Sequence, residues 1–187
     1  MQVAQSERNM RVHLIAAAAV AALGCALPLG LVEQLALLGA TFAVIAAELV
    51  NSALEGLADL VTLEQHEGVR VVKDAAAAAV LVVSVGAVVV LAVVVLASWS
   101  SWSAVAPERA WRVVAVGLPQ VVLSAFLVLR LARPLWLERA ALVLGTVWLA
   151  SLAAVSQNQV FTGLGALVFL VSAAVARASR GRREAAQ

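Results

Sequence analysis

Long apolar runs without charged residues dominate this sequence, and they restrict it to one environment. About 20 residues of α-helix cross the roughly 30 Å hydrocarbon core of a bilayer. Six segments of the chain approach or exceed that length, namely 14–31, 35–61, 75–97, 113–131, 140–155 and 160–176. We therefore predict an all-α fold, a polytopic transmembrane helix bundle with six spans.

The composition excludes the other broad classes of protein. Hydrophobic residues make up 64% of the 187 residues and charged residues 13%, whereas a soluble domain carries about a quarter charged residues. A soluble domain, a disordered chain and a soluble nucleic-acid binder are excluded on this ground, and no nucleic-acid partner is expected. The single cysteine, Cys25, leaves no intrachain disulfide and no cysteine metal cluster.

The basic residues predict the orientation of the spans, because cytoplasmic loops of membrane proteins carry an excess of Lys and Arg. With the N-terminus in the cytoplasm, eleven of the thirteen basic residues lie inside and only Arg109 and Arg112 lie outside. Trp99, Trp102 and Trp111 then gather near the outer surface, as in an aromatic belt. We predict a multi-pass protein with both termini in the cytoplasm.

The second predicted span carries a stripe of polar residues. Within A-E-L-V-N-S-A-L-E-G-L-A-D, intervals of three and four residues place five of them on one helix face, and these are Glu48, Asn51, Ser52, Glu55 and Asp59. Three carboxylates within three turns repel one another and lose hydration near lipid, so such residues commonly mark a functional site. The alternative is a polar seam between helices with a charged cytoplasmic end.

The segment that follows this span adds further candidates: Glu64, His66 and the pair Lys73-Asp74. Lys73 is the only lysine in the chain, while twelve arginines carry the remaining positive charge. The alternative interpretation is that Lys73-Asp74 is a solvated helix start. No phosphate-binding loop, dinucleotide fingerprint or H-E-x-x-H zinc motif occurs, and two histidines, His13 and His66, are too few for a histidine-rich metal site.

Three groups of these residues together resemble a known family. They are E-R-N-M-R-V-H at 7–13, E-x-x-N-S-A-L-E-x-x-x-D at 48–59, and Glu64-Gln65-His66 followed by K-D-A-A-A-A-A-V at 73–80. They resemble the prokaryotic integral-membrane diacylglycerol kinases and their undecaprenol kinase relatives over about 7–96, and the opening motif favours the undecaprenol kinase branch. We accordingly predict a lipid-kinase core of three transmembrane helices at 1–98 and a three-helix membrane extension at 99–187.

The resemblance implies an activity and an assembly. The implied enzyme is a homotrimer in the bacterial cytoplasmic membrane, with active sites at subunit boundaries on the cytoplasmic side. It transfers the γ-phosphoryl group of MgATP to the hydroxyl of a membrane lipid, either diacylglycerol or undecaprenol. The product is phosphatidic acid or undecaprenyl phosphate, Mg²⁺ is the implied cofactor and ATP is the co-substrate.

The resemblance also implies residue roles by motif position. Glu48 corresponds to the catalytic base, and Glu7 and Glu55 correspond to the pair that holds Mg²⁺. The implied nucleotide-binding residues are Glu7, Glu55, Glu64, Gln65, His66, Lys73 and Asp74. The implied lipid-binding residues are Asn9, Met10, Arg11, Val12, His13 and Glu48, and the supporting ones are Asn51, Ser52 and Asp59. Because Glu48 lies seven residues deeper than Glu55, about 10 Å along a helix, we expect it to meet the lipid hydroxyl while Glu55 meets MgATP.

Two features depart from the family pattern. Only six residues precede Glu7, where relatives usually have an amphipathic surface helix, so either the start lies elsewhere or the nucleotide contacts of that helix are absent. The extension at 99–187 has no catalytic constellation, and we expect it to be structural or lipid-guiding. Two other functions stay open. One is a transporter or channel whose carboxylate stripe carries protons or cations, and the other is an inactive assembly subunit.

Overall fold

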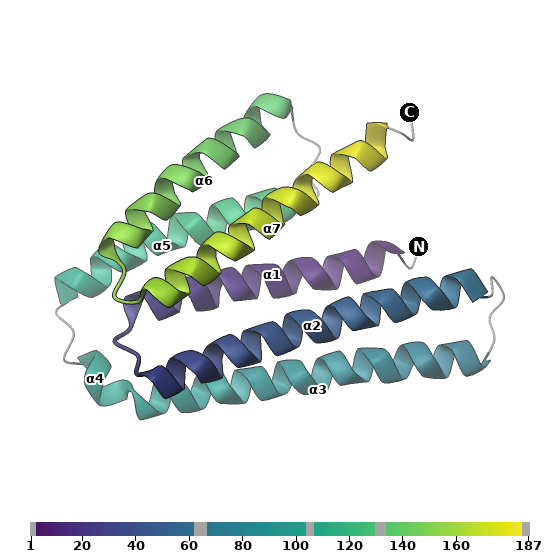
Figure 1. Cartoon of the computed structure of the whole chain (residues 1–187), viewed down its shortest axis with the longest axis horizontal. Helices are drawn as coiled ribbons and strands as arrows, with labels where there is room; N and C mark the ends of the chain where they lie inside the picture. Colours follow the sequence, from purple (N-terminus) through teal and green to yellow (C-terminus); the bar gives the residue numbers. More distant parts are fainter. Residues whose placement is uncertain (1–2, 62–66, 104–106, 130–133, 185–187) are drawn as a thin grey trace. The chain divides into compact units, whose positions relative to one another are not determined.

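The computed structural model describes residues 3–61, 67–103, 107–129 and 134–184. Within these ranges no strand occurs, which confirms the all-α prediction. The helices are, in order, α1 (Val3–Ala26), α2 (Leu31–Val61), α3 (Glu67–Ala97), α4 (Trp99–Ser103), α5 (Pro107–Val128), α6 (Leu135–Val155) and α7 (Gln159–Glu184) (Figure 1).

Five of the described helices are long and apolar enough to cross a membrane: α1 over Asn9–Ala26, α2, α3, α6, and α7 over Gln159–Ala178. The predicted fourth span corresponds to α5, whose apolar part is the shorter stretch Val114–Val128. This stretch is short because α5 begins with the polar segment P-E-R-A-W-R, and the predicted end of the span at 131 lies outside the described residues. The polytopic helical bundle is thus confirmed, with a shorter apolar stretch in the helix that corresponds to the fourth predicted span.

The helices α2 and α3 are longer than the predicted spans require. Each contains 31 residues, or about 46 Å of helix, against a hydrocarbon core of about 30 Å. α3 begins at Glu67, so Lys73-Asp74 lies within the helix. The alternative interpretation placed this pair at the start of a helix, and the structure differs from it. Glu67 in the first turn favours this early start because a carboxylate complements the helix dipole.

The chain divides into two compact units. Unit 1 comprises Met1–His13 and Leu31–Ala97, and unit 2 comprises Leu14–Gly30 and Ser98–Gln187. α1 therefore contributes its first part to unit 1 and its second part to unit 2. The predicted division at 98 coincides with the end of α3. The prediction placed 14–30 in the kinase core, whereas these residues belong to unit 2. The division of function between the two parts stays a prediction.

In unit 1, α2 and α3 run antiparallel beside each other (Figure 1). α3 buries little of itself, since only Val80 and Val94 are buried among its residues. α2 buries one narrow stripe whose members recur every three or four residues, namely Leu37, Thr41, Val44, Glu48 and Asn51. This spacing keeps the five side chains on one face of the helix, and the stripe changes from mainly apolar to polar at Glu48.

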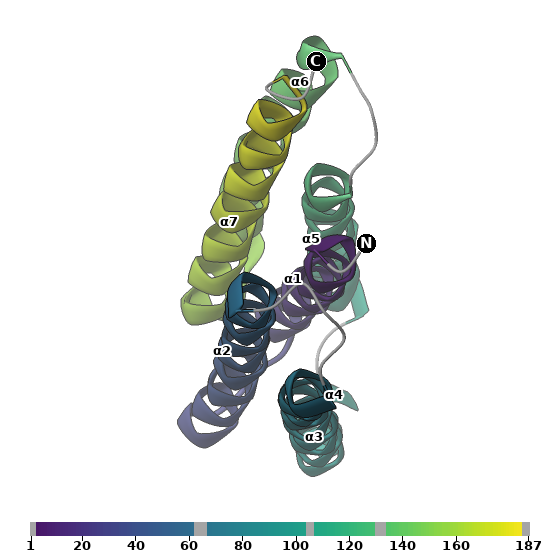
Figure 2. The ribbon, with the colours of Figure 1, turned by 90° about the vertical axis from the view of Figure 1, so that its right-hand side faces the viewer.

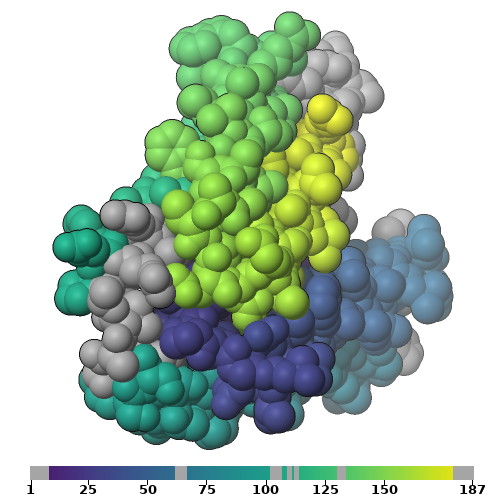
Figure 3. Space-filling model, turned by 60° about the vertical axis from the view of Figure 1, so that its left-hand side comes forward, coloured from purple at the N-terminus to yellow at the C-terminus, as the bar shows by residue number. Residues whose placement is uncertain are grey.

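In unit 2, α6 and α7 form a hairpin that packs against α5 (Figures 2 and 3). A buried core joins the three helices through Leu127, Ala141, Phe169, Ala173 and Ala176. Its packing is close enough that a Cβ atom added at Gly145 would overlap the ring of Phe169. The absence of a side chain at Gly145 therefore lets α6 and α7 approach each other, as small residues do in membrane helix pairs.

The turn between α6 and α7 is a short hairpin, as the segment S-Q-N-Q predicts. The backbone N–H of Val160 donates to Asn158 Oδ1 at 3.0 Å, and the N–H of Asn158 donates to Ser156 Oγ at 3.0 Å. The end of α1 joins this turn, because the N–H of Gln157 donates to the carbonyl of Cys25 at 2.9 Å. Gly24 lies directly against the ring of Phe161, so the second part of α1 is an integral element of unit 2.

The glycine contact in unit 2 predicts a stability difference between two substitutions. Gly145→Ala forces the buried Phe169 ring to move, and overpacking of this kind costs about 1–3 kcal/mol. Gly163→Ala on α7 meets nothing within 4 Å and is the matched control. We expect thermal unfolding in detergent to show a lower Tm for Gly145→Ala and an unchanged or slightly higher Tm for Gly163→Ala. Equal Tm values would contradict this packing.

Candidate functional site

The polar stripe on α2 forms one continuous face, as its spacing predicts. Glu48 is fully buried at 0% exposure and Asn51 is 2% exposed, whereas Ser52, Glu55 and Asp59 are half-buried. Exposure thus increases from Glu48 toward the end of the helix. The stripe therefore combines one carboxylate that is shielded from solvent with two that solvent can reach.

Glu48 is buried on this face without compensating hydrogen bonds from the described residues. Neither of its carboxylate oxygens has a hydrogen-bond partner among the described residues. The imidazole of His13 on α1 lies beside it, with Nε2 4.0 Å from Glu48 Oε2. A buried carboxylate without hydrogen bonds costs several kcal/mol of stability, so a purely structural role is a poor explanation for a glutamate at this position.

Asn51 and Glu55 are linked one turn apart. The Nδ2 of Asn51 donates to Glu55 Oε1 at 3.0 Å, which orients the Glu55 carboxylate along the stripe. The Oδ1 of Asn51 is buried and has no hydrogen-bond partner in the described part of the chain. Two kinds of hard oxygen donor, a carboxylate and an unsatisfied amide carbonyl, therefore lie on adjacent turns.

Lys73 on α3 connects the two long helices at their ends. Its Nζ contacts Asp59 Oδ1 on α2 at 2.5 Å, and Asp74 beside it is exposed. This ion pair joins residues fourteen positions apart and fixes α3 against the more exposed end of the stripe. It brings the only lysine of the chain to the face that carries Glu48 and Glu55.

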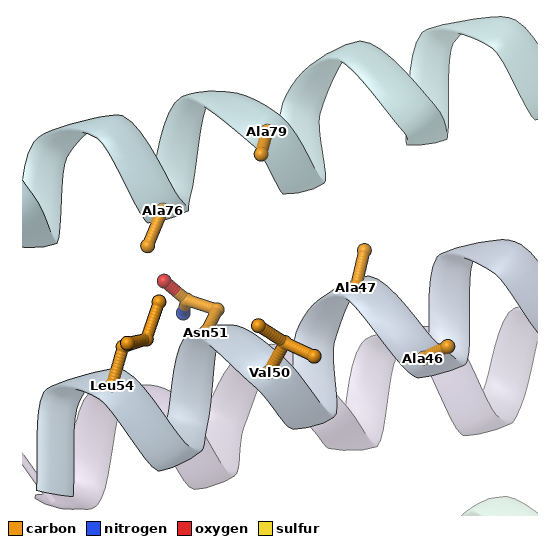
Figure 4. Close-up of a pocket in the computed structure, with 7 residues that line it drawn as sticks. All are labelled: Ala46, Ala47, Val50, Asn51, Leu54, Ala76 and Ala79. Atoms are coloured by element: carbon orange, nitrogen blue, oxygen red, sulfur yellow. The ribbon is translucent and has the colours of Figure 1, made fainter. Parts of the chain in front are cut away.

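A groove runs between α2 and α3 beside this face. It has a volume of about 290 Å³ and is lined by Ala46, Ala47, Val50, Asn51, Leu54, Ala76 and Ala79. Figure 4 shows the side chain of Asn51 pointing from α2 toward α3, with Ala76 and Ala79 facing it. The groove is apolar except for Asn51. The sequence signal for this groove is the alanine run at 75–79, because its small side chains leave space between α3 and α2.

The residues at the start of α1 are brought together only in part. Asn9 and Val12 are exposed, while Met10, Arg11 and His13 are half-buried. Five consecutive helical residues point all around the axis, so they cannot all line one site. His13 contacts the stripe through Glu48. The side chain of Glu7 and residues Glu64, Gln65 and His66 lie outside the described part of the chain.

Among the described residues, no group of three or more His, Cys, Asp or Glu side chains is arranged to hold a metal ion. The donor chemistry nevertheless suits Mg²⁺, which takes oxygen ligands and is usually bound by one or two carboxylates together with phosphate oxygens. The Glu55 carboxylate and the unsatisfied Asn51 Oδ1 supply such oxygens. The side chain of Glu7, the other residue expected to hold Mg²⁺, lies outside the described part of the chain.

Comparison with known proteins identifies the family of this chain. The chain matches the family described as prokaryotic diacylglycerol kinase over residues 1–95. It is 36% identical over 84 residues to the undecaprenol kinase of Bacillus subtilis (strain 168), a match that covers 45% of this chain and 68% of the relative. No solved structure matches the chain. The matched region contains the α2 stripe, His13 and Lys73, and the chain belongs to the prokaryotic diacylglycerol kinase family, a family of integral membrane lipid kinases.

Proposed function

We propose that this chain transfers the γ-phosphoryl group of MgATP to the hydroxyl of a membrane lipid, either diacylglycerol or undecaprenol. The product is phosphatidic acid or undecaprenyl phosphate. The observation that carries the proposal is Glu48, a fully buried carboxylate that lies on the same helix face as Glu55 and has no hydrogen-bond partner among the residues that the structure describes. A lipid hydroxyl supplies the hydrogen bond that this carboxylate lacks, and it is also the group to be phosphorylated.

Glu48 acts in this proposal as the general base. A primary alcohol is a poor nucleophile, and removal of its proton in the transition state accelerates a reaction by about 10²–10⁴-fold. His13, with its Nε2 4.0 Å from Glu48 Oε2, lies beside the carboxylate and positions the hydroxyl next to it. The apolar groove along α2 and α3 suits an acceptor with a hydrocarbon chain, because it opens beside Asn51 on the same helix.

Glu55 lies about two turns closer to the C-terminal end of α2, about 10 Å from Glu48 along the helix axis. Glu55, oriented by Asn51, would hold Mg²⁺ together with Glu7. When bound, the metal ion neutralises charge on the phosphate oxygens, which is the main requirement of phosphoryl transfer. Lys73, held at Asp59, contributes a second positive charge near the nucleotide, and Glu64, Gln65, His66 and Asp74 complete the proposed nucleotide site.

The proposed assembly is a homotrimer in the bacterial cytoplasmic membrane, with both termini and the active sites on the cytoplasmic side. Only Val80 and Val94 of α3 are buried. The rest of this apolar helix is an extensive surface for lipid or for neighbouring subunits. The length of α2 supports a cytoplasmic site, because its 31 residues exceed the hydrocarbon thickness and carry Glu55 and Asp59 toward the headgroups.

The direct test is incubation of the purified full-length chain with radiolabelled ATP and one lipid alcohol at a time. We expect label in phosphatidic acid or in undecaprenyl phosphate, and the faster reaction identifies the acceptor. No labelled lipid from either alcohol, together with no binding of MgATP, would contradict the proposal and favour the inactive subunit. Uptake of protons or cations by vesicles that contain the chain, without phosphorylation, would favour the transporter.

Replacement of the proposed base separates chemistry from binding. Glu48→Gln keeps the size of the side chain but accepts no proton, so we expect turnover to fall by about 10²–10⁴-fold while the affinity for MgATP stays unchanged. Glu48→Asp should be intermediate, since the base survives but is withdrawn by one bond. Glu33→Gln, at the other end of α2, is the matched control and should keep the normal rate. A Glu48→Gln enzyme with more than about half the normal rate disproves the role.

Replacement of the proposed metal ligand should have the opposite pattern. Glu55→Gln removes a charged oxygen donor, and we expect MgATP affinity, measured by calorimetry, to fall by about tenfold or more. Excess Mg²⁺ should restore part of the turnover, because mass action compensates for a weakened site. Unchanged MgATP affinity in Glu55→Gln, with the protein still assembled, would show that the carboxylate does not hold the metal.

A further inference from the structure

The charged residues of α6 and α7 are concentrated at one end of unit 2. All of them lie in the first five residues of α6 or in the last eight of α7, and they comprise five arginines and two glutamates, namely Glu138, Arg139, Arg177, Arg180, Arg182, Arg183 and Glu184. The opposite end, the turn at Ser156, Gln157 and Asn158, has no charge. α6 and α7 are therefore polarised along their length.

The packing of unit 2 places Arg139 and Arg177, the two arginines whose side chains are described, at the same end of the α6–α7 hairpin. Ala141 on α6 and Ala176 on α7 belong to one buried core, and Arg139 and Arg177 lie two residues and one residue away from them. The start of α6 and the end of α7 accordingly lie at the same end of unit 2 (Figure 2). Arg139 and Arg177 are both exposed, so their guanidinium groups reach the surface of two neighbouring helices.

Neither arginine is neutralised within the described part of the chain. No ion pair or hydrogen bond joins the Arg139 or Arg177 side chain to another described residue. Glu138, the acid next to Arg139, is 8% exposed and therefore points away from the surface. Orientation of a helix in the membrane needs only the presence of positive charge. Two unpaired guanidinium groups at the same end of unit 2 are in addition suited to an anion, because each offers several N–H donors.

Trp136 indicates where this end of the α6–α7 hairpin lies with respect to the membrane. It is 66% exposed and lies three residues before Arg139, so the two side chains are neighbours on one face of α6. Exposed tryptophans prefer the interface of the bilayer, where the headgroups lie. The apolar part of α7 ends at Ala178, directly after Arg177, and α7 continues as a helix to Glu184. Both helices thus place an arginine where lipid phosphates are found.

We propose that this basic end of unit 2, formed by Arg139 on α6 and Arg177 on α7, binds the phosphate headgroup of an anionic phospholipid in the surrounding membrane. Guanidinium groups form paired hydrogen bonds with phosphate oxygens, and the apolar flank of α6, with Val143, Leu144 and Val147 exposed, receives the acyl chains. The binding does not require turnover, so it stands or fails separately from the kinase activity.

The test uses the full-length chain in nanodiscs of phosphatidylcholine that contain increasing fractions of phosphatidylglycerol. Bound lipid is counted by native mass spectrometry, and the Tm is followed in parallel. We expect wild type to retain phosphatidylglycerol in preference to phosphatidylcholine. Arg139→Gln and Arg177→Gln should each weaken this preference about fivefold, and the double variant more than tenfold, since each basic residue near an anionic surface contributes a similar increment.

Arg70→Gln is the matched control. Arg70 is an exposed arginine near the start of α3 in unit 1, and its loss changes the net charge equally, so it should leave the preference unchanged. An equal loss in Arg70→Gln, no loss in the double variant, or no preference in wild type would each overturn the proposal. Inorganic phosphate at the same concentration should not raise the Tm, and a rise would show that the site takes free phosphate instead of lipid. Equal Tm values of all variants in pure phosphatidylcholine confirm that they fold.

Discussion

A polar group inside the hydrocarbon core of a membrane must find its partner within the protein, and the arrangement of this chain follows from that constraint. The backbone satisfies it by forming α-helices over most of the described residues. Two buried hydroxyl side chains satisfy it locally: Thr41 donates to the carbonyl of Leu37 at 2.8 Å, and Ser172 to that of Val168 at 2.7 Å. Groups that are buried without such a partner are therefore conspicuous, and Glu48 is the most costly of them because it carries a carboxylate.

The same constraint explains why the polar residues of unit 1 lie on one face of α2. A carboxylate facing lipid would be more expensive than one facing protein, so Glu48 and Asn51 lie in the buried stripe. The stripe reaches water at its far end, where Asp59 is paired with Lys73 of α3. A gradient from a shielded carboxylate to half-buried ones results, and it supports the proposal that Glu48 meets the lipid hydroxyl and Glu55 the nucleotide.

Unit 2 is stabilised in a different way, by close packing of small residues against aromatic rings. Gly145 lies against Phe169 and Gly24 against Phe161, and such close approach is a main source of helix association where the hydrophobic effect between helices is weak. Its buried polar residues do not form an acidic stripe. On α5, Gln120 and Ser124 are buried and their side chains have no hydrogen-bond partner in the described part of the chain, but neither carries a charge.

The sequence by itself determined the helical class, the membrane location of the chain and the face of α2 that carries the polar stripe. These depend on local properties, namely the length of apolar runs and the angular spacing of residues along one helix. The family also followed from the sequence, because its motif spans residues that are close together in the chain. The pair Lys73–Asp59, the groove between α2 and α3 and the approach of His13 to Glu48 required the tertiary structure. Each joins different helices, and the sequence spacing along one helix does not state how a second helix is rotated against it. For the same reason, only the structure assigned the second part of α1 to unit 2: the packing of Gly24 against Phe161 connects residues far apart in the chain, and shape complementarity between distant side chains leaves no periodic signal in a sequence.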